Sequence, residues 1–326
     1  MGKNNYTFKS KSSIIDDKTG IELFIFNDLK ILINNKKIIN MPGEYFPVKY
    51  GMHYGHLLLD CIGNYIYLKK TNPNLKIIFF KYGDVEKNKV CEDLMLFFNA
   101  ESINIFNNNY IFEKFLFFYT EDLRNTLPEE MILNKNTNIF LPPIPSKLFL
   151  EKGYVVDDWS KEWKLLKIKS IESLCETFDK YKIKNNKNKI YVSRTNDFAR
   201  TDNYSTTSWF KKIKERSPMY DQNLNEIMEN KGYKIVYPET MGFFEQINLF
   251  NNATDVVTID GTSVLNAIWC ENDSNITRIM VNKEYKKLNY DWSTLILASG
   301  NKNINILDLT DLEPQHGIDI IIKEIR

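Results

Sequence analysis

Two of the three histidines in this chain, together with an aspartate, lie between Gly51 and Asp60. If the segment is helical, His56 and Asp60 stand four residues apart on one face, within hydrogen-bonding reach of each other. An aspartate so placed orients the imidazole and raises its basicity, as general base catalysis requires. The pattern therefore predicts a base at His56 or Asp60, and it does not decide between the two.

The same segment allows two other interpretations. His53, His56 and Asp60 are all metal-ligating residue types, so they could supply three ligands of a metal site, although the sequence offers no evident fourth. The remaining interpretation is an ordinary helix N-terminus with partly buried polar residues.

A cation follows a short apolar strand in the second half of the chain. Arg194 comes directly after the strand expected over Lys189–Ser193, and Arg200 follows shortly afterwards. The planar guanidinium donates two parallel hydrogen bonds, which suits phosphate. Arg194 is therefore a candidate phosphate ligand, and a plain surface arginine is the alternative.

Polar side chains also follow the next expected strand. Tyr237 and Glu239 come after its apolar run, and Gln246 lies in the helix beyond. Glu239 is suited to accept hydrogen bonds from ribose hydroxyls. Negative charge near a helix N-terminus is favourable in any case, and taken alone that explanation suffices.

A turn of small residues joins a buried-type strand to a helix. It consists of Asp260, Gly261, Thr262 and Ser263, and Asn266 follows within the helix. Free N–H groups at a helix start, together with two hydroxyls, form a cradle for an anion. An ordinary strand–helix turn with a serine N-cap is the alternative.

Several motifs of common nucleotide enzymes are missing. Neither G-x-G-x-x-G nor G-x-x-x-x-G-K-[ST] occurs, which disfavours dinucleotide oxidoreductases and P-loop enzymes. The nucleophile elbow G-x-S-x-G is absent. So is D-x-D, the carboxylate pair with which many nucleotide-sugar enzymes hold a metal.

Alternating strands and helices must position these residues. In the first half we expect a β-hairpin over Ile21–Asn35 that turns at Asn27-Asp28, helices over His53–Lys70 and Val85–Phe98, and strands over Lys76–Phe80 and Ser102–Phe106. In the second half we expect helices over Met241–Asn252 and Ser263–Cys270, and strands over Lys189–Ser193, Tyr233–Tyr237, Asp255–Ile259 and, as the last, Ile276–Val281. This alternation predicts α/β domains with parallel sheets.

A proline-rich loop, Leu141–Pro145, and a charged helix expected over Trp159–Lys182 interrupt the alternation. We therefore expect two Rossmann-like domains that face a cleft, residues 1–165 and 166–326. In such folds ligands bind outside the carboxyl ends of the strands.

Composition excludes several classes of protein. The 326 residues carry 43 Lys+Arg against 42 Asp+Glu, so the net charge of +1 gives no strong field for nucleic acid or an anionic membrane. The four cysteines are far apart and indicate neither a zinc knuckle nor a disulfide framework. We find no signal peptide and no run of about 18 apolar residues, so we expect a cytoplasmic protein without a transmembrane segment. The oligomeric state stays open.

Taken in order, five segments of the chain resemble glycosyltransferase family 61. They are Tyr54–Asp60, Lys189–Arg194, Gly232–Glu239, Phe243–Phe250 and Asp260–Asn266. The resemblance implies a GT-B fold and an inverting transfer from a nucleotide sugar, most often a UDP-sugar, to a glycan or glycoprotein hydroxyl. It implies a role in assembling surface polysaccharides or other glycans. It also implies that no metal or other cofactor is essential, the UDP-sugar being a co-substrate.

The resemblance assigns roles on the donor side. Arg194 would meet the diphosphate, with Arg200 or Arg216 as the second phosphate ligand. The nucleotide pocket would be lined by the polar side chains after the second strand, namely Tyr237, Glu239 and Gln246.

The phosphate turn would be formed by Gly261, Thr262, Ser263 and Asn266. Asp260 departs from the family, which usually has histidine at this place. An acidic residue beside a diphosphate is repulsive unless it points away or binds sugar hydroxyls.

On the acceptor side, His56 and Asp60 would face the cleft together with His53 and Tyr54. Two other functions stay open. The Asp260 departure suits a nucleotide-sugar-binding subunit whose catalytic machinery has decayed. The group of His53, His56 and Asp60 suits a metal-dependent hydrolase.

Overall fold

The structure of the chain is a computed structural model. It describes residues 5–7, 10–15, 18, 22–32, 35–51, 54–81, 87–104, 107–118, 161–193, 218–259, 261–281, 292–301, 303–310 and 312–325.

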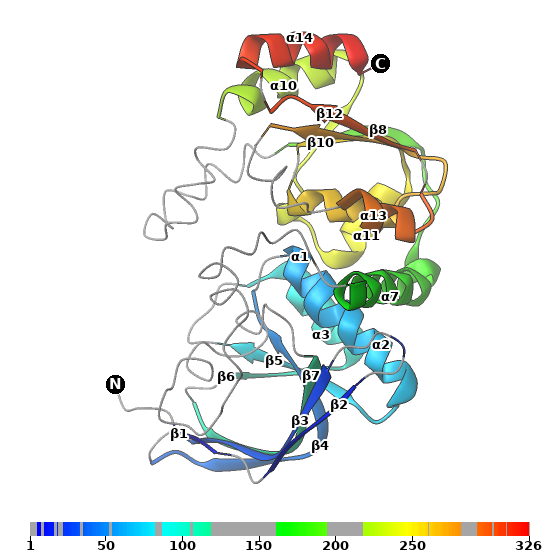
Figure 1. Ribbon diagram of the computed structural model, residues 1–326. Coiled ribbons are helices and arrows are strands. Elements are labelled where there is room, and N and C mark those ends of the chain that lie inside the picture. Colours follow the sequence, from blue (N-terminus) through cyan, green and yellow to red (C-terminus); the bar gives the residue numbers. More distant parts are fainter. Residues whose placement is uncertain are drawn as a thin grey trace, which may run out of the picture. The chain divides into compact units, whose positions relative to one another are not determined.

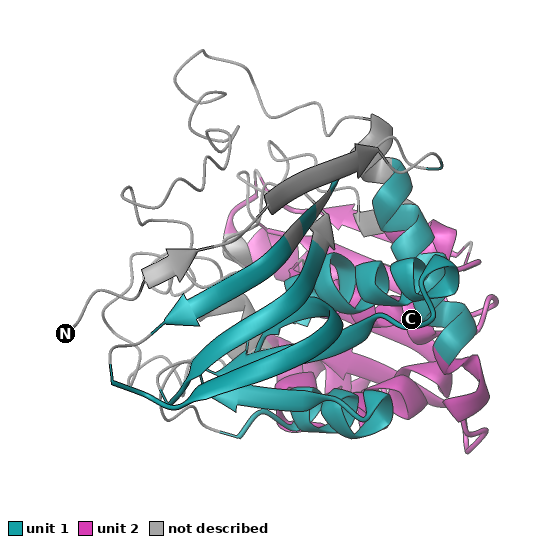
Figure 2. Cartoon of the chain, turned by 90° about the horizontal axis from the view of Figure 1, so that it is seen from below, with its two compact units in different colours: residues 1–177 teal, residues 178–326 magenta. Residues whose placement is uncertain are grey.

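The chain divides into two compact units, residues 1–177 and 178–326, which Figure 2 distinguishes by colour. The division falls near the end of the long helix α7 (Lys161–Phe178), later in the chain than the boundary expected between residues 165 and 166. Both units are mixed α/β structures with sheets rich in parallel pairs, which confirms the α/β part of the predicted fold class.

Unit 1 contains a seven-stranded sheet with the order β1-β3-β7-β4-β5-β6, in which β2 also pairs with β3. Its strands β7, β4, β5 and β6 are mutually parallel, whereas β1, β2 and β7 run antiparallel to β3. The strands are β1 (Asn5–Thr7), β2 (Ser10–Ile15), β3 (Glu22–Leu32), β4 (Ile38–Lys49), β5 (Lys76–Lys81), β6 (Glu101–Asn104) and β7 (Asn109–Phe118).

The prediction of a hairpin that turns at Asn27-Asp28 is wrong, because β3 runs through these residues as one strand. Asp28 has a positive φ of 49°, and the pairing with β7 passes from Asn27–Lys114 to Leu29–Phe112. The alternating pattern was therefore that of one long strand with a local irregularity. Long partners on both sides, β2 and β7, supply its hydrogen bonds.

The helices of unit 1 follow the parallel strands. After β4 the chain forms one continuous helix of three parts, α1 (Tyr54–His56), η1 (Leu57–Ile62) and α2 (Gly63–Thr71). This confirms the helix expected over His53–Lys70, but its middle part is a π-helix, which the apolar spacing did not reveal. Helix α3 (Lys89–Phe98) begins later than predicted, because the Asn88 side chain caps it by accepting from the Cys91 N–H at 3.0 Å.

Unit 2 contains a five-stranded sheet in which every pair is parallel, with the order β12-β11-β10-β8-β9. The strands are β8 (Asn188–Val192), β9 (Lys234–Val236), β10 (Ala253–Ile259), β11 (Asn275–Met280) and β12 (Ile304–Asp308). The chain starts at β8, adds β9 on one side and then places β10 on the other. The strand order therefore reverses between β8 and β10, the position at which open α/β sheets bind ligands.

Helices cover both faces of this sheet (Figure 1). On one face α10 (Pro218–Asn230) and α14 (Pro314–Glu324) pack on a core that includes Tyr191, Leu224 and Ile321. On the other lie α11 (Phe243–Asn251), α13 (Trp292–Ala298) and the 3₁₀ helix η4 (Thr262–Trp269). Ile276–Val281 was expected as the last strand, which is wrong, because β12 and α14 continue the alternation.

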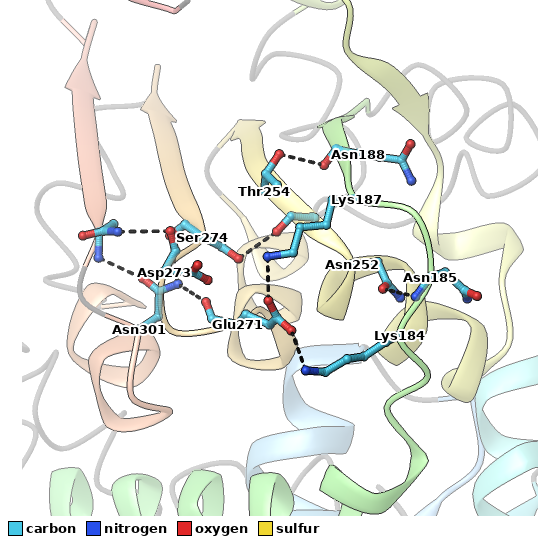
Figure 3. Close-up of polar contacts among 12 residues, drawn as sticks. Lys184, Asn185, Lys187, Asn188, Asn252, Thr254, Glu271, Asp273, Ser274 and Asn301 are labelled. Atoms are coloured by element: carbon cyan, nitrogen blue, oxygen red, sulfur yellow. Dashed lines mark hydrogen bonds and ion pairs between the residues drawn. The ribbon is translucent and has the colours of Figure 1, made fainter.

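Polar side chains tie together the amino-terminal edge of this sheet (Figure 3). The Ser274 hydroxyl donates to the Ala253 carbonyl at 2.7 Å, and the Asn301 amide donates to the Glu271 and Ser274 carbonyls at 3.0 Å. Lys187 pairs with Glu271 at 2.9 Å. These contacts provide hydrogen-bond partners for the loops at this edge, and the unit 2 residues of the candidate site described below lie at the opposite, carboxyl-terminal edge.

Among the described residues, no helix combines the length and the apolar character needed to cross a membrane.

Candidate active site

The helix that carries His56 begins just beyond the carboxyl end of β4, with Tyr54 as its first residue. Three residues further along, at Leu57, a π-helical stretch begins, and at its end the Gly63 N–H donates to the Leu58 carbonyl five residues back. A π-turn is wider than an α-turn and is frequently found at functional sites. It lies between His56 and Gly63, and Asp60 is within it.

The predicted contact between His56 and Asp60 is present. Imidazole Nδ1 lies 2.7 Å from carboxylate Oδ2, a hydrogen-bonding distance. The two partners differ in exposure, since 30 % of the His56 side chain is accessible and only 7 % of that of Asp60. The imidazole can therefore meet a substrate, whereas the carboxylate faces the interior.

A lysine that sequence reasoning did not single out completes this group. Lys167 of α7 forms an ion pair with Oδ1 of Asp60, and only 2 % of its side chain is exposed. Lysine is almost never fully buried without a partner. Burial lowers the pKa of Lys167 well below its usual value, and the adjacent carboxylate acts against this effect. Asp60 thus binds a cation on one oxygen and an imidazole on the other.

Two neutral side chains hold the helices together beneath this group. Asn64 donates to the Asp60 carbonyl at 2.7 Å, and the Ser170 hydroxyl donates to Asn64 Oδ1 at 2.7 Å. Gly63 permits the close approach, because a Cβ there would lie 2.6 Å from Ser170 Cβ. The packing of α7 against this helix therefore fixes where Lys167 meets Asp60.

In unit 2, the carboxyl ends of β9, β8 and β10 bring three predicted segments to one edge of the sheet. Tyr237 and Glu239 follow β9, and Glu239 belongs to the 3₁₀ turn η3 (Pro238–Thr240). Ser193 follows β8, and its backbone N–H donates to the Val236 carbonyl at 3.1 Å, which extends the pairing with β9. Gly261 to Ser263 follow β10.

The turn after β10 has a conformation that favours glycine, since Gly261 has a φ of 151°. The Val264 N–H donates to the Gly261 carbonyl at 3.1 Å and closes the first turn of η4. The Ser263 and Thr258 hydroxyls lie 3.2 Å apart. The predicted helix after β10 is therefore a 3₁₀ helix, with Thr262 and Ser263 in its first turn.

Two of the predicted donor-site residues are internal braces. Asn266 of η4 donates to Gln246 Oε1 at 3.0 Å, and Gln246 donates to the Pro238 carbonyl at 2.9 Å. Both side chains are buried. They link η4, α11 and η3, and so hold the turns after β9 and β10 in place. Tyr237 accepts a hydrogen bond from the Asn225 amide at 3.5 Å.

Several predicted residues lie outside the described part of the chain. They are His53, Arg194, Arg200, Arg216 and Asp260. Within the described part, no three His, Cys, Asp or Glu side chains gather in a way that could hold a metal ion.

A comparison with models of known protein families shows to which family the chain belongs. Residues 54–277, more than half of the chain, match the family model described as Glycosyltransferase 61. This chain belongs to glycosyltransferase family 61. Family membership implies a glycosyltransferase that acts on a donor and an acceptor substrate. No curated protein matches the chain.

The segment shared with family 61 contains both groups described above. It begins at Tyr54, the first residue of the helix that carries His56, and it extends beyond the turn after β10. Lys167 lies within it too, although this lysine carried no recognisable signal. It stands in a helix with many charged residues, and only its burial and its partner distinguish it.

Proposed function

We propose that this member of family 61 is an inverting glycosyltransferase that moves a sugar from a UDP-sugar to a hydroxyl of a glycan or glycoprotein, in the assembly of surface polysaccharides or other glycans. The observation that carries the proposal is the pairing of a partly exposed imidazole, His56, with a buried carboxylate, Asp60. A positioned imidazole is the commonest general base in enzymes.

The pairing favours His56 over Asp60 as the base. One oxygen of Asp60 meets Lys167 and the other meets His56, and the carboxylate is almost inaccessible. When Nδ1–H donates to Asp60, the lone pair of the imidazole is on Nε2, which can accept the proton of an acceptor hydroxyl. Asp60 then acts by orienting the ring and stabilising the imidazolium that forms.

The carboxyl edge of the unit 2 sheet supports a donor site. Three adjacent parallel strands end there, and the strand order reverses between two of them. In the proposal, Arg194 and the N–H groups of the turn at residues 261–263 bind the diphosphate and stabilise the charge that develops on the leaving UDP. Tyr237 and Glu239 line the nucleotide pocket, and Gln246 and Asn266 hold the two turns.

The proposed reaction is a single displacement in a GT-B arrangement. His56 Nε2 takes the acceptor proton as the acceptor oxygen bonds to the anomeric carbon. The bond from that carbon to the diphosphate breaks, and UDP leaves with the electron pair. Attack opposite the leaving group inverts the anomeric configuration. No bound metal is required, because protein cations and N–H groups meet the diphosphate.

Histidine variants test the proposal with a matched control in the same chain. UDP release and product anomer are followed with UDP-sugar donors and glycan acceptors, with and without chelator. His56→Ala should lose about 10²–10⁴-fold in kcat while UDP still binds. His316→Ala is the control, since His316 is exposed on α14, and it should keep wild-type activity.

Each alternative predicts a different result. Near-normal turnover in His56→Ala would overturn the assignment of the base. A wild-type chain that binds UDP but neither transfers nor hydrolyses any donor would be a decayed binding subunit. Stoichiometric zinc, with activity abolished by chelator, would favour the metal-dependent hydrolase.

A further inference from the structure

Lys167 is the only buried lysine in the part of the chain that the structure describes, and it contacts Asp60 inside unit 1. Burying a charge is costly unless an opposite charge accompanies it. Helix η1 contributes Asp60 to this group, α1 contributes His56, and α7 contributes Lys167. The other side chains that join these helices here, Asn64 and Ser170, are neutral.

These groups have a simple charge balance. An ionised Asp60 and a protonated Lys167 cancel, and the imidazole of His56 is then neutral. Among the residues that the structure describes, no lysine or arginine other than Lys167 pairs with Asp60, so removal of the lysine charge would leave this buried carboxylate without a cationic partner there. The group would then draw a proton in its place, because low-dielectric surroundings penalise a lone charge.

We propose that Lys167 is a positioning residue that sets the protonation state of the His56–Asp60 pair, by supplying the positive charge that a proton would otherwise supply. For catalysis the inference rests on the proposed function, in which His56 is the base. The inference about protonation itself rests only on the buried ion pair and the hydrogen bond on the two oxygens of Asp60.

A proton drawn into the pair would block the base wherever it resides. On the imidazole it gives an imidazolium, in which Nε2 carries a hydrogen. On the carboxylate it makes Asp60 the donor to Nδ1, so that the neutral ring must carry its hydrogen on Nε2. In both cases Nε2 has no lone pair with which to accept the acceptor proton. Lys167 therefore keeps Nε2 unprotonated near neutral pH.

Nuclear magnetic resonance of the ring nitrogens tests this directly in the full chain. The chain has only three histidines, so His56 is assigned from its absence in His56→Gln. At pH 7 the wild type should show Nδ1 protonated and Nε2 unprotonated. Lys167→Met should show Nε2 protonated at the same pH, with the change to unprotonated Nε2 moved up by about one pH unit or more.

Two further variants separate charge from folding. Lys167→Arg keeps the charge and should retain unprotonated Nε2. Lys169→Met is the matched control, since Lys169 lies on the same helix and pairs with Glu172 at 2.7 Å while 37 % exposed, and it should behave as wild type. Melting curves establish that each variant is folded. Unprotonated Nε2 at pH 7 in folded Lys167→Met would overturn the inference.

The measurement on the wild type does not depend on whether a variant folds. If Nε2 of His56 is protonated at pH 7 in the wild type, the inference is overturned. The acid limb of kcat/KM should move to higher pH in Lys167→Met, with UDP binding unchanged, and return in Lys167→Arg. If the chain transferred no sugar, the nitrogen measurements would still decide the inference, so its failure and that of the proposed function are distinguishable.

Discussion

The Ser170 hydroxyl donates to Asn64 Oδ1 at 2.7 Å, across 106 residues of sequence, and Asn64 donates to the Asp60 carbonyl at 2.7 Å. These bonds join α7 to the helix that carries His56. Gly63, the neighbour of Asn64, is the point of close approach. The geometry of the proposed base thus depends on a helix contact that lies below it.

Gly63→Ala tests this contact. A Cβ at position 63 would lie 2.6 Å from Ser170 Cβ and 3.0 Å from the Leu58 carbonyl oxygen, so a helix must shift. We expect a loss of about 1–3 kcal/mol in the free energy of unfolding, as for other overpacked sites. Urea unfolding measures it. Gly63→Ala combined with Ser170→Gly should recover part of the loss, and additive losses in the double variant would contradict the contact.

The sequence predicted the part of the candidate site that is formed by residues close together in the chain. The spacing of His56 and Asp60 sufficed, because residues four apart on a helix meet without help from the rest of the fold. Lys167 was not predictable in this way, because a lysine in a charged helix gives no sign of burial. Its role depends on the packing of α7, which the spacing of nearby residues does not specify.

The same distinction between local and long-range information explains which strands of the two sheets were predicted. Short apolar runs predicted β5, β8, β10 and β11 because buried parallel strands have such sequences. Strand β4 was missed because Pro42, Gly43 and Pro47 lie in it, and such residues weaken a strand prediction. The fold accommodates them with a register shift between Met41 and Glu44, where Gly43 has a φ of 101°.

Asn266→Ala tests the brace in unit 2. The substitution removes the donor to Gln246 Oε1, and both side chains are buried. Leaving a buried acceptor without this bond should cost about 1–3 kcal/mol, and UDP binding should weaken because the turns after β9 and β10 lose their link. Chemical unfolding and a nucleotide titration measure the two effects.

Asn275→Ala is the matched control for that brace. Asn275 donates to Asp255 at 3.1 Å in an exposed pair at the other edge of the sheet. Surface substitutions usually stay within about 0.5 kcal/mol. Equal losses in the two variants would show that burial of the bond is not what matters.

We expect the ionisation of Tyr65 to lower the free energy of unfolding at alkaline pH. Burial raises the pKa of Tyr65 to about 12, from a usual value of 10.0. Between these values the folded chain binds the proton more tightly than the unfolded chain, so the free energy of unfolding falls as pH rises. The contribution of Tyr65 to the free energy of unfolding is fully present below pH 10.0 and is lost as the pH rises through about 12.

Tyr65→Phe removes this titration. Relative to the variant, the wild type should lose on the order of 2 kcal/mol between those two pH values. Unfolding by urea at a series of pH values measures the difference. Parallel curves for the two proteins would mean that Tyr65 ionises as readily in the folded chain as in the unfolded one.

Nucleotide binding is the measurement on which the donor site depends. Melting of the wild type is followed with UDP, GDP, CMP and TDP, each with and without a divalent metal. A ligand at 100 times its Kd stabilises the folded chain by about 2.7 kcal/mol, so a rise in melting temperature with UDP alone would identify the nucleotide.

Arg194→Ala should lose the rise in melting temperature with UDP, because each charge-assisted bond to phosphate is worth about 1.5–3 kcal/mol. Lys187→Ala removes a cation at the amino end of β8, where it pairs with Glu271 at 2.9 Å, and it should respond as wild type. Equal loss in both variants would indicate binding by general charge, and a response to zinc but to no nucleotide would contradict the donor site.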